Sequence, residues 1–295
     1  MTNRSGAPVV VGVDGSASAL DAVRAAARTA AAQHRPLRVV HAFVWPLYAT
    51  AQGPLPTDLG LRRQADQLVA EAVTEAKKVA ADLPVTGAVV DGPPTPVLLH
   101  AVRDAALLVL GHRGLGGFTE LLVGSTAVQV SARADCPVLV VRGEPRADGP
   151  VVVGVDGSAV STEALGFAFA EAARRDAALV AVHAWQIPTP FVAGEVLPLV
   201  YDLDAATAVE ERNLAEAVAG WSERYPEVPV RQRLVYGAPA RALIEESATA
   251  QLTVVGAHGR GALGGMLLGS VSHTVLHHAK GPLAIVRHRA GSHPH

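Results

Sequence analysis

An internal repeat governs how this chain can fold. Residues 9–17 read VVVGVDGSA, and residues 151–159 read the same nine letters, 142 positions later. His41-Ala42 recurs as His183-Ala184 at the same spacing. A period of this length spans a whole domain rather than a short solenoid unit, so we expect two copies of one fold.

The repeat continues with a longer spacing. Gly92 recurs as Gly237 and Gly111 as Gly256, both 145 positions later. The second copy therefore carries a net three extra residues between His183 and Gly237. Equivalent residues that stay aligned over such a distance indicate duplication of an entire domain.

The length of the chain agrees with two domains. It has 295 residues, of which 49% are hydrophobic and 18% charged, so each half can bury a core. The stretch GEPRADGP at residues 143–150 is polar and rich in Pro and Gly, as linkers are. We predict one domain at residues 1–145 and a second at residues 150–290.

Strand-like and helix-like segments alternate within each half. VVVGV is a run typical of a strand buried on both faces, and an Ala-rich segment with apolar residues at helical spacing follows it. Such alternation predicts parallel strands with right-handed crossovers, hence an α/β fold with a doubly wound sheet in each half. Strands are expected at 9–13, 37–44, 85–90, 107–110, 137–141, 151–155, 179–184, 228–235, 252–255 and 283–286, and first-half helices at 61–81, 94–106 and 125–134.

A glycine-rich loop follows the fourth strand of each half. Gly111 and Gly114 are three apart, nine residues separate Gly114 from Gly124, and Ser125 follows at a helix start. The same spacing recurs in Gly256, Gly259, Gly269 and Ser270. A strand, a glycine loop and a helix N-terminus form an anion site from backbone N–H groups and the helix dipole. The chain is therefore predicted to bind a nucleotide twice.

These loops differ from two common phosphate-binding motifs. They lack the Lys-Ser/Thr pair of a P-loop, and they do not follow the first strand as a dinucleotide fingerprint does. Ser125 and Ser270 are expected to cap their helices and to donate to phosphate. Arg113 and Arg260 can add positive charge, although they occupy different loop positions.

An aspartate ends the first strand of each half. Asp14 and Asp156 should share a crevice with the glycine loops, where a carboxylate can accept ribose hydroxyls or help to hold a metal ion. Aspartate at this place also caps turns and helices. Both interpretations remain open, and the two roles are compatible.

Several other features limit the function. The net charge of −2 gives no general attraction to nucleic acid or to an anionic membrane. The single cysteine, Cys136, excludes an internal disulfide and fits a reducing compartment. The first apolar run is too short for a signal peptide, and no stretch is long enough to span a bilayer. We expect a cytoplasmic protein with no nucleic-acid partner and no integral membrane segment.

Histidines offer no clear catalytic group. His41 and His183 end buried strands and are expected to be packed and hydrogen bonded rather than catalytic bases. His273 and His277 are four apart and could chelate a metal, but no carboxylate or cysteine completes the set, so a solvated helix face is expected. We therefore predict neither a metal site nor catalytic residues.

The absence of a lysine and of a general base near the loops favours nucleotide binding with slow or incidental hydrolysis over phosphoryl transfer. Two alternatives remain. One is a weak ATPase or an adenylyl-transferring enzyme on the same scaffold. The other is a module that binds another ligand, such as cyclic AMP or a flavin.

The repeated Gly-x2-Gly-x9-Gly-Ser motif and the repeated VGVDGS opening carry a resemblance. Each half resembles a universal stress protein domain, and the chain is similar to the tandem members of that family. The resemblance implies two five-stranded sheets of order 3-2-1-4-5, of the adenine nucleotide alpha hydrolase-like kind, that pair through their fifth strands. It also implies binding of ATP, alone or with Mg²⁺, a homodimer, and a nucleotide-dependent regulator of stress or growth with an unknown protein partner.

The resemblance assigns a set of binding residues to each half. The stretches at 40–42 and 182–184 would border the adenine, the aspartates the base and ribose, and the loops the phosphates. In the first half these residues are Gly12, Asp14, Ala42, Gly111, His112, Arg113, Gly114, Leu115, Gly116, Gly117, Gly124, Ser125 and Thr126. In the second half they are Gly154, Asp156, Ala184, Gly256, Ala257, His258, Gly259, Arg260, Gly261, Ala262, Gly269, Ser270 and Val271.

Overall fold

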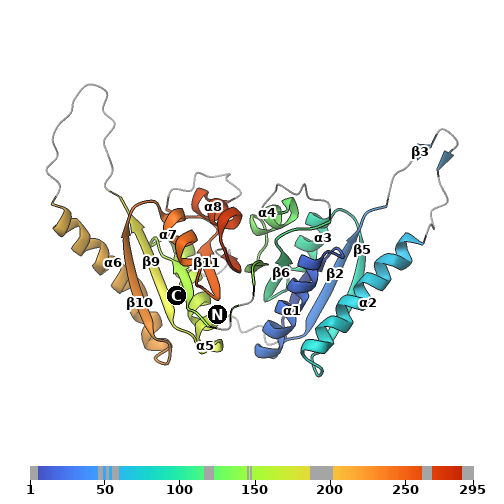
Figure 1. Ribbon diagram of the computed structural model, residues 1–295, viewed down its shortest axis with the longest axis horizontal. Coiled ribbons are helices and arrows are strands. Elements are labelled where there is room, and N and C mark those ends of the chain that lie inside the picture. The colour runs from blue at the N-terminus through green and yellow to red at the C-terminus, as the bar shows by residue number, and fades with distance from the viewer. Residues whose placement is uncertain are drawn as a thin grey trace. The chain divides into compact units, whose positions relative to one another are not determined.

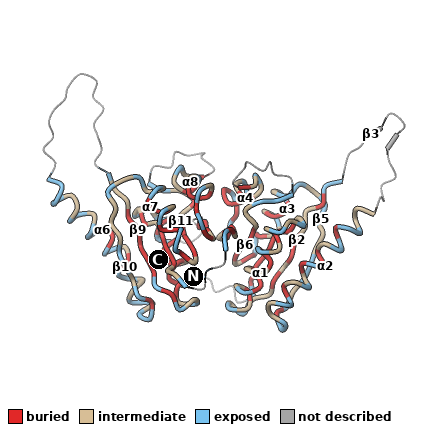
Figure 2. The backbone as a smooth tube through the Cα atoms, in the orientation of Figure 1, coloured by how far each residue is buried: buried red, intermediate tan, exposed pale blue. Residues whose placement is uncertain are grey.

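The computed structural model describes residues 6–45, 49–50, 53–54, 60–115, 123–144, 146, 148–186, 202–260 and 268–287. The chain forms two compact units (Figure 1). The first unit comprises residues 1–144 with 282–295, and the second comprises residues 145–281. In both units the central strands form the buried layer and the helices cover them (Figure 2).

The first unit has the expected strand order. Its parallel strands lie in the order β5-β2-β1-β6-β7, which is 3-2-1-4-5 along the repeat. They are β1 (Val9–Val13), β2 (Leu37–Phe43), β5 (Val85–Asp91), β6 (Leu107–Gly111) and β7 (Val138–Val141). All five residues of β1 are buried, as its β-branched run predicts.

A sixth strand comes from the far end of the chain. β12 (Leu283–Val286) pairs antiparallel with β7, with Leu283 opposite Val140 and Ile285 opposite Val138. The fifth strands of the two repeats therefore pair within the chain, as expected. Because β12 packs with the first unit, the compact second unit ends at Gly281, whereas the second repeat continues through this strand.

The second unit repeats the first four positions of this order. Its strands lie in the order β10-β9-β8-β11, and the pairs are parallel. They are β8 (Val151–Gly154), β9 (Leu179–Trp185), β10 (Val230–Tyr236) and β11 (Leu252–Gly256). β10 begins after Pro229, which has no N–H to give to a strand ladder, and so starts two residues later than expected.

Helices connect the strands. In the first unit they are α1 (Ala17–Ala32), α2 (Leu61–Val79), α3 (Pro94–Ala101) and α4 (Ser125–Ser131); in the second they are α5 (Ala159–Arg174), α6 (Leu203–Arg224), α7 (Pro239–Glu246) and α8 (Ser270–His278). Right-handed crossovers place α1 beside α2 on one face of the sheet and α3 beside α4 on the other. The carboxyl ends of the central strands thus open between α1 and the start of α4.

Local sequence explains where α1 and α5 begin. Ser16 and Ser158 are the N-caps, and their hydroxyls accept the backbone N–H of Ala19 and Ser161 at 3.1 and 3.2 Å. Alanines form most of the buried face of α1, which lets the helix approach the sheet closely.

Apart from shifts of one or two residues at the ends of elements, three features differ from the expectation. α3 ends at residue 101 rather than 106, because a turn in which Ala105 donates to the Val102 carbonyl replaces its last residues. α4 ends at residue 131 rather than 134. A short hairpin of β3 (Ala49–Thr50) and β4 (Gly53–Pro54) lies between β2 and α2, where no strand was expected.

Candidate functional site

Each unit has a cavity at the carboxyl ends of its strands. The first cavity measures about 650 Å³ and the second about 350 Å³. The first is lined by Gly12, Val13, Asp14, Ala19, Val40, Ala42, Pro94, Leu98, Leu110, Gly111, Arg113, Gly114, Gly124, Ser125, Thr126 and Ala127. The second is lined by Gly154, Val155, Asp156, Val182, Ala184, Pro239, Leu243, Val255, Gly256, His258, Gly259, Arg260, Gly269, Ser270, Val271 and Ser272.

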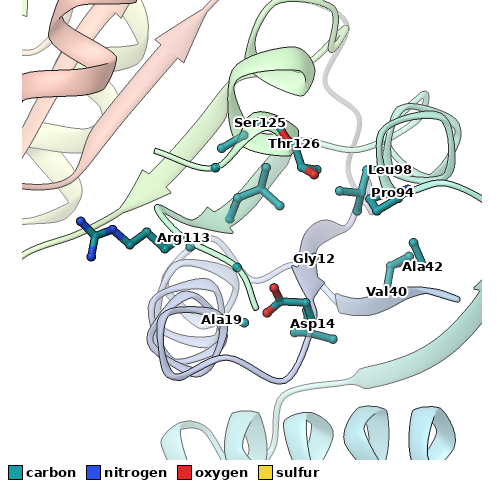
Figure 3. A pocket seen from close by; sticks show the side chains of 16 residues that line it. Gly12, Asp14, Ala19, Val40, Ala42, Pro94, Leu98, Arg113, Ser125 and Thr126 are labelled. Carbon is teal, nitrogen blue, oxygen red and sulfur yellow. The ribbon is translucent and has the colours of Figure 1, made fainter. Parts of the chain in front are cut away.

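The aspartate after the first strand ties two loops together. The Asp14 Oδ1 accepts the Ser16 N–H at 3.0 Å, and its Oδ2 accepts the Leu115 N–H at 2.8 Å (the residue appears between Gly12 and Ala19 in Figure 3). The first bond is the turn-capping interaction that the sequence left open. The second fastens the turn after β1 to the glycine loop, over a separation of 101 residues.

The second unit has the same two hydrogen bonds to its aspartate. Asp156 Oδ1 accepts the Ser158 N–H at 2.9 Å, and its Oδ2 accepts the Arg260 N–H at 3.1 Å. Each carboxylate oxygen has two lone pairs, so both aspartates keep acceptor capacity toward their cavities.

The motif glycines are needed because neighbours come close. A Cβ on Gly259 would lie 2.5 Å from the Asp156 Oδ2, and one on Gly114 would overlap the Asp14 Oδ2 still more. A Cβ on Gly111 would lie 2.7 Å from the Ser18 backbone. None of these three glycines has a positive φ among the described residues. Close approach, rather than a left-handed backbone, therefore requires glycine here.

The serines that follow do not cap their helices. The N-caps of α4 and α8 are Gly124 and Gly269, with no side-chain cap hydrogen bond, and Ser125 and Ser270 are the first helical residues. The expectation of serine caps was wrong by one position, because glycine already occupies the extended cap conformation.

The amide of each N-cap glycine is already used. Gly124 donates its N–H to the His112 carbonyl, and Gly269 donates to the Ala257 carbonyl, both at 2.8 Å. These bonds close each glycine loop at its base. A ligand would instead meet the first-turn amides of α4 and α8, which have no partner within a helix.

The arginines of the two loops take different positions. Arg113 lines an edge of the first cavity, but its side chain extends away from Asp14 and Ser125 (Figure 3). Burial, and then the charge of Arg113, lowers the pKa of Arg142 to about 10. In the second unit the Arg260 guanidinium lies over the turn after β8, where a Cβ on Gly157 would come 3.1 Å from its Cζ.

Some expected site residues lie off the cavities. His112 is held by the Ser18 hydroxyl at 3.1 Å and the Val141 carbonyl at 3.2 Å; burial, and then the charge of Arg142, lowers its pKa. Leu115 is 73% exposed, and Ala257 is fully buried. None of these three described residues lines either of the two cavities. Gly116, Gly117, Gly261 and Ala262 lie outside the described residues.

The sequence did not lead us to predict the apolar wall of each cavity. Pro94 and Leu98 of α3 line the first cavity, and Pro239 and Leu243 of α7 line the second. The signal was present, because these pairs recur at the spacing of 145, each shortly after a repeated glycine. Together with Val40 and Ala42 they form a surface suited to a flat apolar ring.

The strand-end histidines are hydrogen bonded, as expected. The Nδ1 of His41 lies 2.8 Å from the Val13 carbonyl, and that of His183 lies 2.7 Å from the Val155 carbonyl. His273 and His277 have ring centroids 4.6 Å apart. Among the described residues, no group of three or more His, Cys, Asp or Glu side chains could hold a metal.

Comparison with known proteins identifies relatives across the chain. The sequence model of the universal stress protein family matches residues 7–142 and 149–287. A universal stress protein of Mycobacterium tuberculosis is 42% identical over 290 residues, which cover 95% of this chain and 96% of that protein. One of Mycolicibacterium smegmatis is 37% identical over 293 residues, covering 95% and 97%.

Solved structures share the fold. The crystal structure of a universal stress protein from Archaeoglobus fulgidus superimposes with a TM-score of 0.71 at 16% identity, and the match covers 96% of this chain and 98% of that one. In the described part of this chain, no helix has both the length and the apolar character needed to cross a membrane.

Proposed function

This chain belongs to the universal stress protein family, and from that premise we propose that each of its two repeats binds one adenine nucleotide, with ATP as the ligand. One observation carries the proposal: the same chemical layout surrounds a cavity in both units. In each, the motif glycines, the first residue of a helix, apolar side chains and an aspartate line the same cavity.

The residues divide into three roles. The apolar wall, formed by Val40, Ala42 and Leu98 in the first unit, would hold the adenine ring. The Asp14 carboxylate would accept ribose hydroxyls with its remaining lone pairs. The first-turn amides of α4 and the Ser125 hydroxyl would donate to phosphate oxygens. The equivalent residues of the second unit would act in the same way.

The size of each cavity suits this ligand class. Small-molecule sites span about 300 to 1,000 Å³ and combine an apolar lining with a few polar groups. Both cavities fall in that range. Mg²⁺, when present, would keep most of its waters and bind chiefly to the phosphates, because it needs only one or two protein carboxylates.

We further propose how the bound nucleotide is used. The protein would act as a homodimer in the cytoplasm, as a regulator whose protein partner recognises the nucleotide-bound form. Hydrolysis would be slow, because neither cavity lining includes a lysine among the described residues to clamp the transferring phosphate.

Equilibrium dialysis tests the central proposal. Purified chain should bind ATP with a stoichiometry approaching two, and cyclic AMP and a flavin should be measured beside it. Mass spectrometry of ligand released from the purified protein gives an independent identification. If no adenine nucleotide binds at millimolar concentration, the proposal fails.

A further inference from the structure

The residue after the second motif glycine differs between the repeats. Leu115 follows Gly114 in the first, and Arg260 follows Gly259 in the second. Each donates its backbone N–H to the aspartate of its own repeat, at 2.8 and 3.1 Å. The backbones at this position are therefore fixed in the same way, and the difference between the repeats is the chemistry of one side chain.

Both side chains lie over the turn that follows the first strand of their repeat. A Cβ on Gly15 would lie 3.7 Å from the Leu115 Cδ1 and 2.8 Å from the Leu68 Cδ1. A Cβ on Gly157 would lie 3.1 Å from the Arg260 Cζ and 3.3 Å from its Nε. The turn is thus covered by apolar atoms in the first repeat and by a guanidinium in the second.

The Arg260 guanidinium lies close to Asp156. Gly157 is the next residue along the chain, so the Arg260 Cζ lies within about 9 Å of the Asp156 Cα. Asp156 and Arg260 both line the second cavity, and Arg260 is also exposed, which places it at the mouth. Leu115 does not line the first cavity.

The guanidinium of Arg260 is available to a ligand. Among the residues that the structure describes, no hydrogen bond or ion pair engages it. The hydrogen bond from Asn213 and, to a smaller extent, the charge of Arg260 lower the pKa of Glu210. However, the Glu210 Oε2 lies 3.1 Å from the Asn213 amide and 3.0 Å from the His183 Nε2. The five N–H donors of the guanidinium can therefore meet an anion at the cavity mouth.

A carboxylate and a guanidinium side by side suit a ribose that carries a phosphate. A carboxylate that accepts one ribose hydroxyl disfavours a phosphate on the other, because like charges repel. A nearby arginine reverses this preference in dinucleotide sites, since its planar fork matches phosphate oxygens. In the first cavity the Arg113 side chain extends away from Asp14 (Figure 3), so that carboxylate has no guanidinium beside it.

We propose that Arg260 is a specificity-determining residue: it makes the second cavity prefer adenine nucleotides with a phosphate on a ribose hydroxyl over those with phosphates only at the 5′ position. The first cavity, with Leu115 at this place, has no such preference. The inference rests on the proposed function, because it needs an adenine nucleotide in the cavity. The ribose phosphate meets Arg260 at the mouth and takes no space from the cavity of about 350 Å³.

Isothermal titration of the full chain with three isomeric nucleotides tests the inference. ADP, adenosine 2′,5′-bisphosphate and adenosine 3′,5′-bisphosphate contain the same atoms and differ in where the second phosphate is attached. An Asp14→Ala chain isolates the second site. At low ionic strength at least one bisphosphate should bind about fivefold more tightly than ADP, a modest factor because Arg260 is exposed.

The same titrations identify the ligand class. A larger preference for the 2′-phosphate or for the 3′-phosphate shows which ribose hydroxyl carries the phosphate in the natural ligand. Raising the ionic strength to about 0.5 M should reduce the preference to less than about twofold, because salt screens an exposed charge pair.

Variants separate the guanidinium from general damage. Arg260→Leu introduces the residue that the first repeat has here, so the fold should persist. In the Asp14→Ala background it should reduce the affinity ratio of bisphosphate to ADP to about one or below, because the carboxylate then acts alone. Arg212→Leu, the matched control, removes an exposed arginine that lines neither cavity and should keep the preference.

The reciprocal change transfers the preference. Leu115→Arg in an Asp156→Ala chain should give the first site a preference for a bisphosphate that the Asp156→Ala chain itself lacks. A chain without that gain would show that this residue does not set the difference between the sites, and would overturn the inference.

The outcomes distinguish this inference from the proposed function. Binding of ADP with no preference for either bisphosphate, or a preference that Arg260→Leu leaves unchanged, overturns the inference while the proposed function stands. If the parent chain binds none of the three nucleotides at millimolar concentration, the proposed function itself is refuted, and the inference with it.

Discussion

Gly114 and Gly259 lie against the carboxylates of Asp14 and Asp156, at distances that leave no room for a Cβ atom. The aspartates in turn accept an N–H from the residue that follows each glycine. Glycine and aspartate therefore form one structural unit in each repeat. The sequence predicted both residue types at the site, but their mutual contact depends on a fold that joins residues about a hundred positions apart.

Gly114→Ala should weaken nucleotide binding in the first unit. The new methyl group would displace the Asp14 carboxylate and break its bond to the loop, so the loop would lose its position. Isothermal titration should show loss of one binding event. Gly220→Ala is the matched control: a Cβ there meets nothing within 4 Å, and the change should stabilise α6 by about 0.5 to 1 kcal/mol without affecting binding. Unchanged affinity in Gly114→Ala would mean that the loop is only a connector.

His112 should make stability depend on pH. Burial lowers its pKa, so the unfolded chain takes up a proton more readily than the folded one. Its contribution is fully present above the unfolded pKa of about 6.5 and is lost as the pH falls toward the lowered folded value. Urea unfolding between pH 5 and 7.5 should therefore show a shallower loss of stability on acidification in His112→Asn than in the parent. Equal slopes would show that this ring does not titrate differently on folding.

At the scale of elements, β12 shows how a strand can belong to one repeat by sequence and to the other unit by packing. Leu283 and Ile285 are buried, and their strand pairs antiparallel with β7. Its continuous run of apolar residues is the strand expected at residues 283–286, and the structure confirms it. Its pairing partner lies some 145 residues away and is decided by which sheet edge remains open.

Ile285→Ala should destabilise the first unit. Removing a side chain that is only 1% exposed should cost about 2 to 5 kcal/mol, from lost apolar burial and the cavity left behind. Hydrogen exchange in β7 should accelerate with it, although β7 is distant in sequence. Leu203→Ala, at a position 53% exposed, is the control and should change the unfolding free energy by less than about 0.5 kcal/mol. Unaltered exchange in β7 would contradict the pairing.

For the whole molecule, duplication gives two cavities with equivalent glycines and aspartates but with arginines at different loop positions. Arg113 corresponds in sequence to His258, and Arg260 corresponds to Leu115. Both repeats have the hydrogen bond from a loop N–H to the aspartate carboxylate, whereas their arginines occupy different positions in the loop. We therefore expect two binding events of unequal affinity.

Single and double aspartate variants should separate the two binding events. Asp14→Ala should leave about one ATP per chain, Asp156→Ala should leave the other, and the double variant should bind none, because each loop loses the acceptor that holds it. Equilibrium dialysis gives the stoichiometry, and circular dichroism checks that the fold persists. A double variant that still binds two nucleotides would exclude the aspartates from the sites.

The sequence by itself determined the repeat, the alternation of strands and helices, the strand ends within two residues at most positions, and the glycine spacing. These are local patterns, set by propensity, periodicity and the need for close backbone approach. Only the tertiary structure decided that glycines rather than serines cap α4 and α8, that α3 and α7 supply the apolar wall, and that Glu210 meets His183. The caps follow from the backbone conformation of the two glycines. The other two depend on which segments the folded sheet brings together; the repeat marks the residues of the apolar wall, but only the fold shows that they line a cavity.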